Sequence, residues 1–142
     1  MWLLGTLIIL WLLAAIGVHE PEMLRELKRR YAVIRSDLPR DPRWHLLKDK
    51  VSIVTGVGSR SGTVGLNVNK GYEIYICLSN DMEDIESAMY VFLHELAHMT
   101  VSEYDHSTEF WKNFKDLRHL AETMGVFKPK TNKKEYCGDK VF

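Results

Sequence analysis

The sequence has little cysteine and no excess of charge of either sign. Its 142 residues include two cysteines, Cys77 and Cys137, which are too few for a disulfide scaffold and do not have the spacing of a zinc knuckle. They could pair in an oxidising compartment, but we expect both to be free, one in a strand and one in the tail. Basic and acidic residues number 19 each, so the chain as a whole has no electrostatic footprint for nucleic acid.

Charged side chains are absent from residues 2–18, WLLGTLIILWLLAAIGV. This run is near the lower length limit of a membrane-spanning helix, and we interpret residues 1–20 as an N-terminal transmembrane anchor. A cleaved signal peptide and a buried helix remain as alternatives, although no basic residue precedes the run and it has no polar face. Residues 21–142 are then enough for one domain.

Basic residues follow the apolar run directly, at Arg25, Lys28, Arg29 and Arg30. Because positive charge near a membrane span tends to stay on the cytoplasmic side, we expect a single-pass protein whose domain faces the cytoplasm. Free cysteines suit the same compartment. The first partner predicted for this chain is therefore the membrane itself.

The pattern of apolar residues predicts a small α+β domain. Steps of three and four residues indicate helices, and alternation and branched residues indicate strands. The glycines between residues 56 and 65 predict a loop, and residues 38–44, with two prolines, predict a connector. The expected helices cover residues 21–34, 82–99 and 107–124, and the expected strands cover residues 51–54 and 72–78.

A basic cluster lies near the end of the chain, at Lys128, Lys130, Lys133 and Lys134. Short runs of charge are usually solvated, so we interpret this segment as an exposed tail. It supports one alternative function, that of a membrane-anchored adaptor whose tail binds an acidic partner.

The sequence His94-Glu95-Leu96-Ala97-His98 falls late in the predicted helix 82–99. Side chains four residues apart project from the same side of a helix, so both imidazoles can bind one metal ion. Neutral imidazole is a good zinc ligand. Glu95, next to the first ligand, can take a proton from a water that the metal activates. The motif therefore predicts a hydrolytic zinc site with Glu95 as its base.

A catalytic zinc site needs a third protein ligand and keeps one position open. Of the downstream side chains we favour His106, because it precedes the next predicted helix, where the chain has turned back toward the motif. His119 and Glu122 remain as alternatives. The full set of candidates is Glu103, Asp105, His106, Glu109, His119 and Glu122.

Three segments, GLNVNKGYEIYICLSN, LHELAH and HSTEFW, together resemble the WLM and SprT-like zinc metallopeptidases. The resemblance covers residues 66–111. It implies a minimal zincin fold, a strand before the HExxH helix, a site of His94, Glu95, His98 and His106, and an aromatic pair at Phe110 and Trp111. It also implies that the strand at 72–78 is an edge along which an extended substrate pairs; a plain hairpin partner is the alternative for that strand.

The motif and the resemblance together predict a zinc-dependent metalloendopeptidase that hydrolyses peptide bonds of protein or peptide substrates and is tethered to a membrane. His94, His98 and His106 would hold Zn²⁺, and Glu95 would be the general base. Tyrosines that could stabilise an oxyanion are Tyr72, Tyr75, Tyr90 and Tyr104. The alternative is a catalytically inactive, membrane-anchored zinc-binding or adaptor protein.

Overall fold

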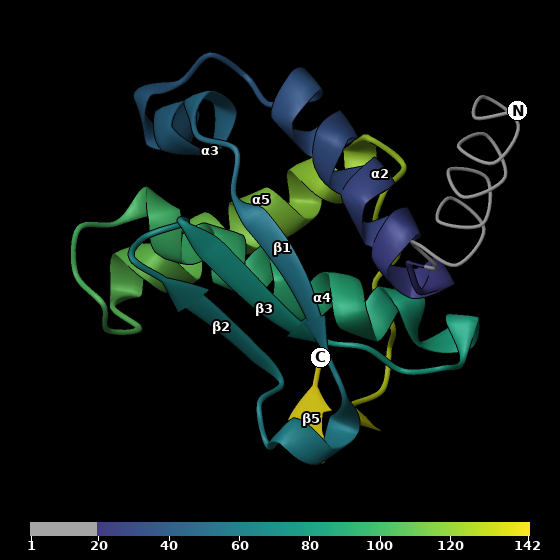
Figure 1. Ribbon diagram of the computed structural model, residues 1–142. Helices are drawn as coiled ribbons and strands as arrows, with labels where there is room; N and C mark the ends of the chain where they lie inside the picture. The colour runs from purple at the N-terminus through teal and green to yellow at the C-terminus, as the bar shows by residue number, and fades with distance from the viewer. Residues whose placement is uncertain (1–19) are drawn as a thin grey trace, which may run out of the picture.

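The computed structural model describes residues 20–142 and has the mixed α+β composition expected from the sequence (Figure 1). Four short 3₁₀ turns, at Pro42–Trp44, Ser59–Ser61, Met82–Asp84 and His98–Thr100, join or extend the main elements. The helices and strands are, in chain order, α2 (Glu22–Asp37), α3 (His45–Asp49), β1 (Ile53–Val57), β2 (Gly65–Val68), β3 (Glu73–Cys77), α4 (Ile85–Ala97), α5 (Thr108–Thr123), β4 (Lys134–Tyr136) and β5 (Asp139–Val141).

The first three strands form one sheet in the order β1-β3-β2. β1 pairs with β3 in parallel, and β2 pairs with β3 in antiparallel orientation. β3 is therefore the central strand, and the expectation that residues 72–78 form an edge is wrong. The edges are β1 and β2. The sequence does not show β2 as a strand, because β2 is short and begins at Gly65, within the glycine-punctuated region expected to be a loop.

The helix α4 packs against the inner face of this sheet, on which the side chains of Val54, Ile74 and Ile76 are buried. In Figure 1 the strands lie in front of α4 and α5. Nine of the thirteen residues of α4 are buried, as expected for a helix between a sheet and other helices. The motif residues are consequently carried by the most enclosed helix of the domain.

The helix α2 covers the same core from another side, with five buried residues at helical spacing. Tyr31 meets Phe92 of α4 edge to face, with ring centroids 5.3 Å apart, and its hydroxyl accepts a hydrogen bond from the backbone N–H of Ser52 at 2.9 Å. Among residues 20–142 no helix has both the length and the apolar character needed to cross a bilayer. The anchor predicted for residues 2–18 lies outside the described residues.

The solvated tail predicted from the lysines is found in part. Lys128 and Lys133 are exposed and lie outside any strand, whereas Lys134 begins β4. The residues that follow form a two-stranded hairpin, β4–β5, and a disulfide bond joins Cys77 at the end of β3 to Cys137 in the turn of the hairpin. The expectation of two free cysteines is therefore wrong, because the fold brings residues 60 positions apart into contact. The pairing also removes the free cysteines as a reason to place the domain in the cytoplasm, since disulfides persist in oxidising compartments.

Candidate metal centre

The helix α4 and the turn that follows it position the first three motif residues. The predicted helix 82–99 is confirmed in outline, but it is α-helical only from Ile85 to Ala97, and His98 begins a 3₁₀ turn. The N-terminal end is fixed by Asp81, whose side chain accepts a hydrogen bond from the backbone N–H of Glu83 at 2.9 Å. His94 and His98 are half-buried and lie on the same side of the helix, as their spacing predicts.

A short loop then returns His106 to the motif. Its far end is fixed by Ser107, the N-cap of α5, whose hydroxyl accepts a hydrogen bond from Phe110 N–H at 3.1 Å. Its near end is fixed by Thr100, whose hydroxyl accepts a bond from the side-chain amide of the buried Asn113 at 2.9 Å. Ser107 caps α5, and Thr100 is held by Asn113 of α5. The packing of α5 against α4 therefore determines the position of His106.

The three histidines converge through their Nε2 atoms. The Nε2 of His106 lies 3.1 Å from that of His94 and 3.2 Å from that of His98. One imidazole nitrogen has either one proton or one lone pair, so it cannot make two well-directed hydrogen bonds at once. All three ligand atoms lie within 4.8 Å of one another.

The arrangement fits a zinc ion. Zinc binds imidazole nitrogen at about 2.0–2.1 Å in a tetrahedron, which separates two ligand nitrogens by roughly 3.3–3.4 Å. The two short separations at His106 are close to that value. Three imidazoles with a fourth position left open are the donor set of one kind of catalytic zinc site.

Aromatic side chains of α5 pack against the three imidazole rings. The fully buried Phe110 has its ring centroid 4.5 Å from that of His98, 5.0 Å from that of His94 and 4.9 Å from that of His106. Trp111 adds a contact to His106 at 5.5 Å. The aromatic pair that the family resemblance implied therefore lies directly against the histidines.

The surroundings keep these histidines neutral. Burial, reinforced by the neighbouring imidazoles, lowers the pKa of His94 to about 4 and that of His98 to about 4. A neutral imidazole has a lone pair available for a metal. At neutral pH the two side chains are thus already in the protonation state that binding requires.

Glu95 is buried beneath the edge strand, with 7% of its surface exposed. Burial raises the pKa of its carboxyl to about 7. A Cβ atom added to Gly65 of β2 would lie 2.5 Å from Val91 Cγ1, 3.1 Å from Glu95 Cγ and 3.3 Å from its Oε1, so the glycine lets β2 lie close against α4 at this carboxylate. Asn67, also on β2, donates a hydrogen bond from its side-chain amide to the backbone carbonyl of Glu95 at 2.8 Å.

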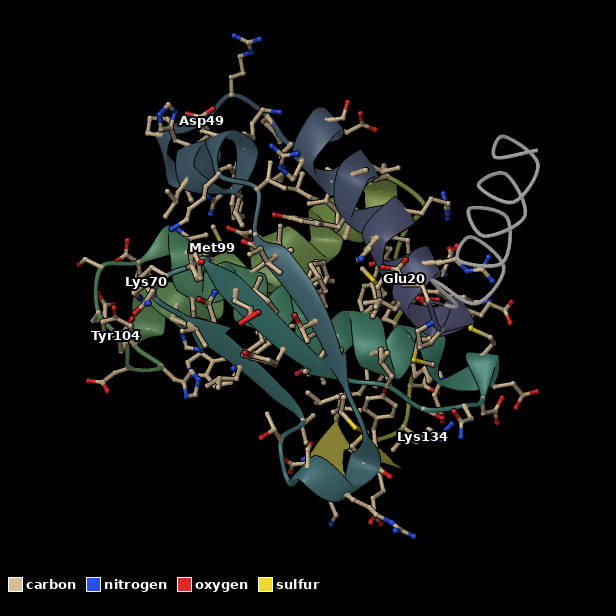
Figure 2. The ribbon with its side chains drawn as sticks, in the orientation of Figure 1. Glu20, Asp49, Lys70, Met99, Tyr104 and Lys134 are labelled. Carbon is tan, nitrogen blue, oxygen red and sulfur yellow. A yellow bond between two sulfur atoms is a disulfide. The ribbon has the colours of Figure 1, made fainter. Side chains whose placement is uncertain are left out.

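Lys70 reaches across the site from the turn between β2 and β3. Its ammonium donates to the backbone carbonyl of His98 at 2.9 Å and to that of Glu103. It also lies 4.4 Å from the ring centroid of Tyr104; Figure 2 shows Lys70 and Tyr104 together at this end of the sheet. Sequence reasoning missed Lys70 and Asn67, because nothing in a single sequence distinguishes them from ordinary turn residues.

A cavity of about 530 Å³ contains His94, Glu95, His98 and His106. The edge strand β2 forms one side of this cavity, Lys70 and Tyr104 line it at the end of β2, and Asp139–Val141 of the hairpin line it elsewhere. Of the four tyrosines considered as oxyanion donors, Tyr90 and Tyr104 line the cavity, while Tyr72 and Tyr75 do not.

The other candidates for a third ligand do not belong to this group of three histidines. Within residues 20–142, the group of side chains able to hold a metal consists of His94, His98 and His106. His119 and Glu122 are exposed on α5, and Glu103 accepts a hydrogen bond from the hydroxyl of Ser107 at 2.6 Å.

Comparison with known proteins agrees with this geometry. The family model of the WLM domain matches residues 44–141. The chain belongs to the WLM domain family. This is a family of SprT-like, zincin-type metallopeptidases that generally depend on zinc.

Two viral proteins are similar to this WLM chain. The uncharacterized protein R325 of Acanthamoeba polyphaga mimivirus is 38% identical over 78 residues, which are 50% of this chain and 40% of that protein. The uncharacterized protein 136R of Invertebrate iridescent virus 6 is 28% identical over 93 residues, which are 61% of this chain and 52% of that protein. The chain thus spans about half or less of the length of these relatives, and no solved structure matches it.

Proposed function

We propose that this protein is a zinc-dependent metalloendopeptidase that hydrolyses peptide bonds in protein substrates. The observation that carries the proposal is the convergence of three imidazole nitrogens beside a buried carboxylate, in a cavity open to an edge strand. His94, His98 and His106 are the proposed zinc ligands, and Glu95 is the proposed general base. A purely structural site would have no use for Glu95 at this position.

Glu95 performs the proton transfers in the proposed reaction. Bound zinc would lower the pKa of a water molecule and polarise the carbonyl of the substrate. Glu95 accepts one proton from the attacking water, and the water oxygen bonds to the carbonyl carbon. The carboxyl then gives this proton to the amide nitrogen as the C–N bond breaks, which leaves one amine and one carboxylic acid; the acid releases the second proton of the water and becomes a carboxylate.

The edge strand β2 is the proposed docking surface for the substrate backbone. One row of the backbone hydrogen-bonding groups of β2 is paired with β3. The other side of β2 borders the cavity. An extended peptide can add to such an edge by main-chain hydrogen bonds. The proposed substrates are therefore extended peptides or loosely folded proteins.

Metal content and hydrolysis of an unstructured protein test the proposal in the 142-residue chain. We expect one zinc per chain in the wild type and in Glu95→Gln, with hydrolysis reduced by about 10²–10⁴-fold in Glu95→Gln. His106→Ala should bind zinc more weakly. His119→Ala, which removes an exposed histidine of α5, is the matched control and should leave zinc binding and hydrolysis unchanged.

Two results would contradict the proposal. A wild-type chain that binds no zinc even with excess metal would favour the adaptor function. Stoichiometric zinc without hydrolysis of any unstructured protein would favour an inactive zinc-binding protein.

We also propose that residues 2–18 tether the enzyme to a membrane. The support is the uncharged run of apolar residues and the basic residues that follow it. The full chain should sediment with membranes and resist extraction at high pH, and a chain lacking residues 2–18 should not. Equal sedimentation of the two chains would exclude the tether.

A further inference from the structure

The hairpin β4–β5 is held in place by bonds to the rest of the domain. A two-stranded hairpin is marginally stable by itself. Here the disulfide from Cys77 to Cys137 joins its turn to the end of β3, and the Tyr136 hydroxyl donates to the backbone carbonyl of Cys77 at 2.6 Å. Lys134 pairs with Asp84, before α4, at 2.6 Å. The hairpin therefore has one fixed position relative to β3 and α4.

That position makes the hairpin a wall of the candidate active site. Asp139, Lys140 and Val141 of β5 line the same cavity as His94 and Glu95. The hairpin lies near the start of β2, because its partner Cys77 donates its N–H to the carbonyl of Val64 at 2.9 Å; Figure 1 shows β5 at this end of the sheet. Lys70 and Tyr104 lie beyond the other end of β2, so a peptide paired with β2 would extend toward the hairpin in one direction.

The surface at the hairpin end is apolar. Val141 lies in the cavity lining together with Val64 and with Tyr90 and Val91 of α4, one helical turn before the motif. The ring of Tyr90 is fixed between Phe114, at 5.1 Å, and Phe142, at 4.8 Å between centroids. Asp139 and Lys140 are exposed neighbours of opposite charge, so the rim of this surface has no net charge and favours neither sign in a ligand.

We infer that the C-terminal hairpin, positioned by the Cys77–Cys137 disulfide, forms a subsite that selects an apolar substrate side chain beside the scissile bond. This inference rests on the proposed function, since it assigns substrate specificity to the same site. The selecting residues are Val64, Tyr90, Val91 and Val141. Cys77 and Cys137 act as positioning residues because they fix the wall without touching the ligand.

The test measures peptide binding and cleavage separately. Zinc-loaded Glu95→Gln chain is titrated with peptides that carry Leu, Gln, Glu or Lys at one position, scanned on both sides of the expected scissile bond. The same peptides are assayed for cleavage by the wild type. We expect a preference of about tenfold or more for Leu over Gln, within the range of discrimination that an apolar pocket provides.

Two changes should alter this preference without removing the metal. In Cys77→Ser/Cys137→Ser the hairpin is no longer joined to β3 by the disulfide. The ratio of Leu to Gln affinities should therefore fall toward one, while the zinc content stays at one per chain. Lys140→Glu should raise the affinity for the Lys peptide relative to the Glu peptide by several-fold. Lys133→Glu makes the same change of charge at an exposed position just before β4 and outside the cavity; it is the matched control and should leave all ratios unchanged.

The results separate the inference from the proposed function. Unchanged ratios in both Lys140→Glu and the serine variant would overturn the hairpin subsite, even if the wild type cleaves peptides. A Leu preference that these variants alter, in a chain that cleaves nothing, would support the subsite and contradict the peptidase. If the serine variant loses its fold, the comparison of Lys140→Glu with Lys133→Glu still decides, because both lysines are exposed.

Discussion

Lys70 shows how one side chain outside the motif can hold the geometry of the candidate metal centre. An ammonium has three N–H donors, and here two backbone carbonyls and the face of Tyr104 take the directions available to it. Burial lowers the pKa of Lys70. Because its donors are used, Lys70 is suited to hold the loop of His106 against the end of α4 and not to bind a substrate carboxylate.

Lys70→Met should weaken zinc binding by roughly tenfold, the size expected for one lost hydrogen bond to a charged group. The loop that carries His106 would then be free to move. Competition with a chromophoric chelator measures the affinity, and the absorption bands of the cobalt-loaded chain report the ligand geometry. Lys112→Met, an exposed lysine of α5, should change neither; an unchanged cobalt spectrum in Lys70→Met would remove the proposed role.

Gly65→Ala should abolish most hydrolysis and leave zinc bound. The added Cβ would lie 2.5 Å from Val91 Cγ1 and 3.1 Å from Glu95 Cγ, so β2 must move away from α4 or the side chains of Val91 and Glu95 must shift. The metal ligands are not in that contact. Gly58→Ala is the control, since a Cβ there meets nothing within 4 Å and the backbone φ of −81° suits any residue. Equal activity of the two variants would show that the close approach at Gly65 has no effect on Glu95.

The roles of single residues were predictable where a motif fixes them and not elsewhere. His94, Glu95 and His98 follow from helical periodicity, and the structure brings His106 to them as expected. Gly65 and Asn67 of β2 contact α4, and Lys70 in the turn after β2 binds the segment that follows α4; these contacts join residues about 30 positions apart in the chain. No local pattern encodes such contacts.

At the scale of elements, α2 is joined to α4 by an ion pair that is largely shielded from water. Arg30 donates to Glu86 at 2.7 Å and to the backbone carbonyl of Val126 at 3.0 Å. Glu86 also accepts from the N–H of Lys128 at 3.1 Å. Three segments thus meet at one pair of side chains, of which 14% and 15% is exposed.

Arg30→Met should lower the free energy of unfolding by about 2–4 kcal/mol, because it leaves Glu86 enclosed without its partner. Chemical denaturation measures this loss. The double variant Arg30→Met/Glu86→Gln should recover part of it. Arg25 is exposed on the same helix, and Arg25→Met should lower the free energy of unfolding by less than about 0.5 kcal/mol. A similar loss in both variants would show that the pair of Arg30 and Glu86 does not stabilise the protein.

A second ion pair on α2 makes a small contribution that depends on pH. Hydrogen bonds from Arg29, and then from Arg30, lower the pKa of Glu26 to about 2. A carboxyl whose pKa is lower in the folded state stabilises the protein above its unfolded value of 4.5, and this contribution disappears as the pH falls toward 2.

Glu26→Gln should therefore cost less than about 1 kcal/mol at pH 7, as for other pairs near the surface. The difference in unfolding free energy between wild type and variant should shrink below pH 4.5 and approach zero near pH 2. Denaturation curves at a series of pH values measure it. A difference that stays constant from pH 7 to pH 2 would show that the charge of Glu26 does not stabilise α2.

The elements themselves were only partly predictable. The helices α2, α4 and α5 follow from apolar periodicity and capping residues, and all three were found near their expected bounds. The strands β2, β4 and β5 are three or four residues long, too short for alternation to stand out from a loop. These segments are strands because their backbones pair with a neighbour, β2 with β3 and β4 with β5.

At the scale of the whole molecule, the order of the strands decides what the site can do. The strands do not lie in chain order: β3 is in the centre, which leaves β2 beside the cavity. That arrangement depends on the parallel pairing of β1 with β3, a contact between segments about 20 residues apart. The fold class could be read from the sequence; the identity of the edge strand could not.

The disulfide closes a covalent ring of the chain from Cys77 to Cys137, and His94, Glu95, His98 and His106 all lie within it. In a chain-entropy description a ring of this size stabilises the folded state by about 4 kcal/mol. The ring also keeps the chain covalently connected if one peptide bond between Cys77 and Cys137 is broken. If a protease cut the exposed loop between His98 and His106, the two ends would stay joined through the sulfur atoms, and the fragments would separate only after reduction.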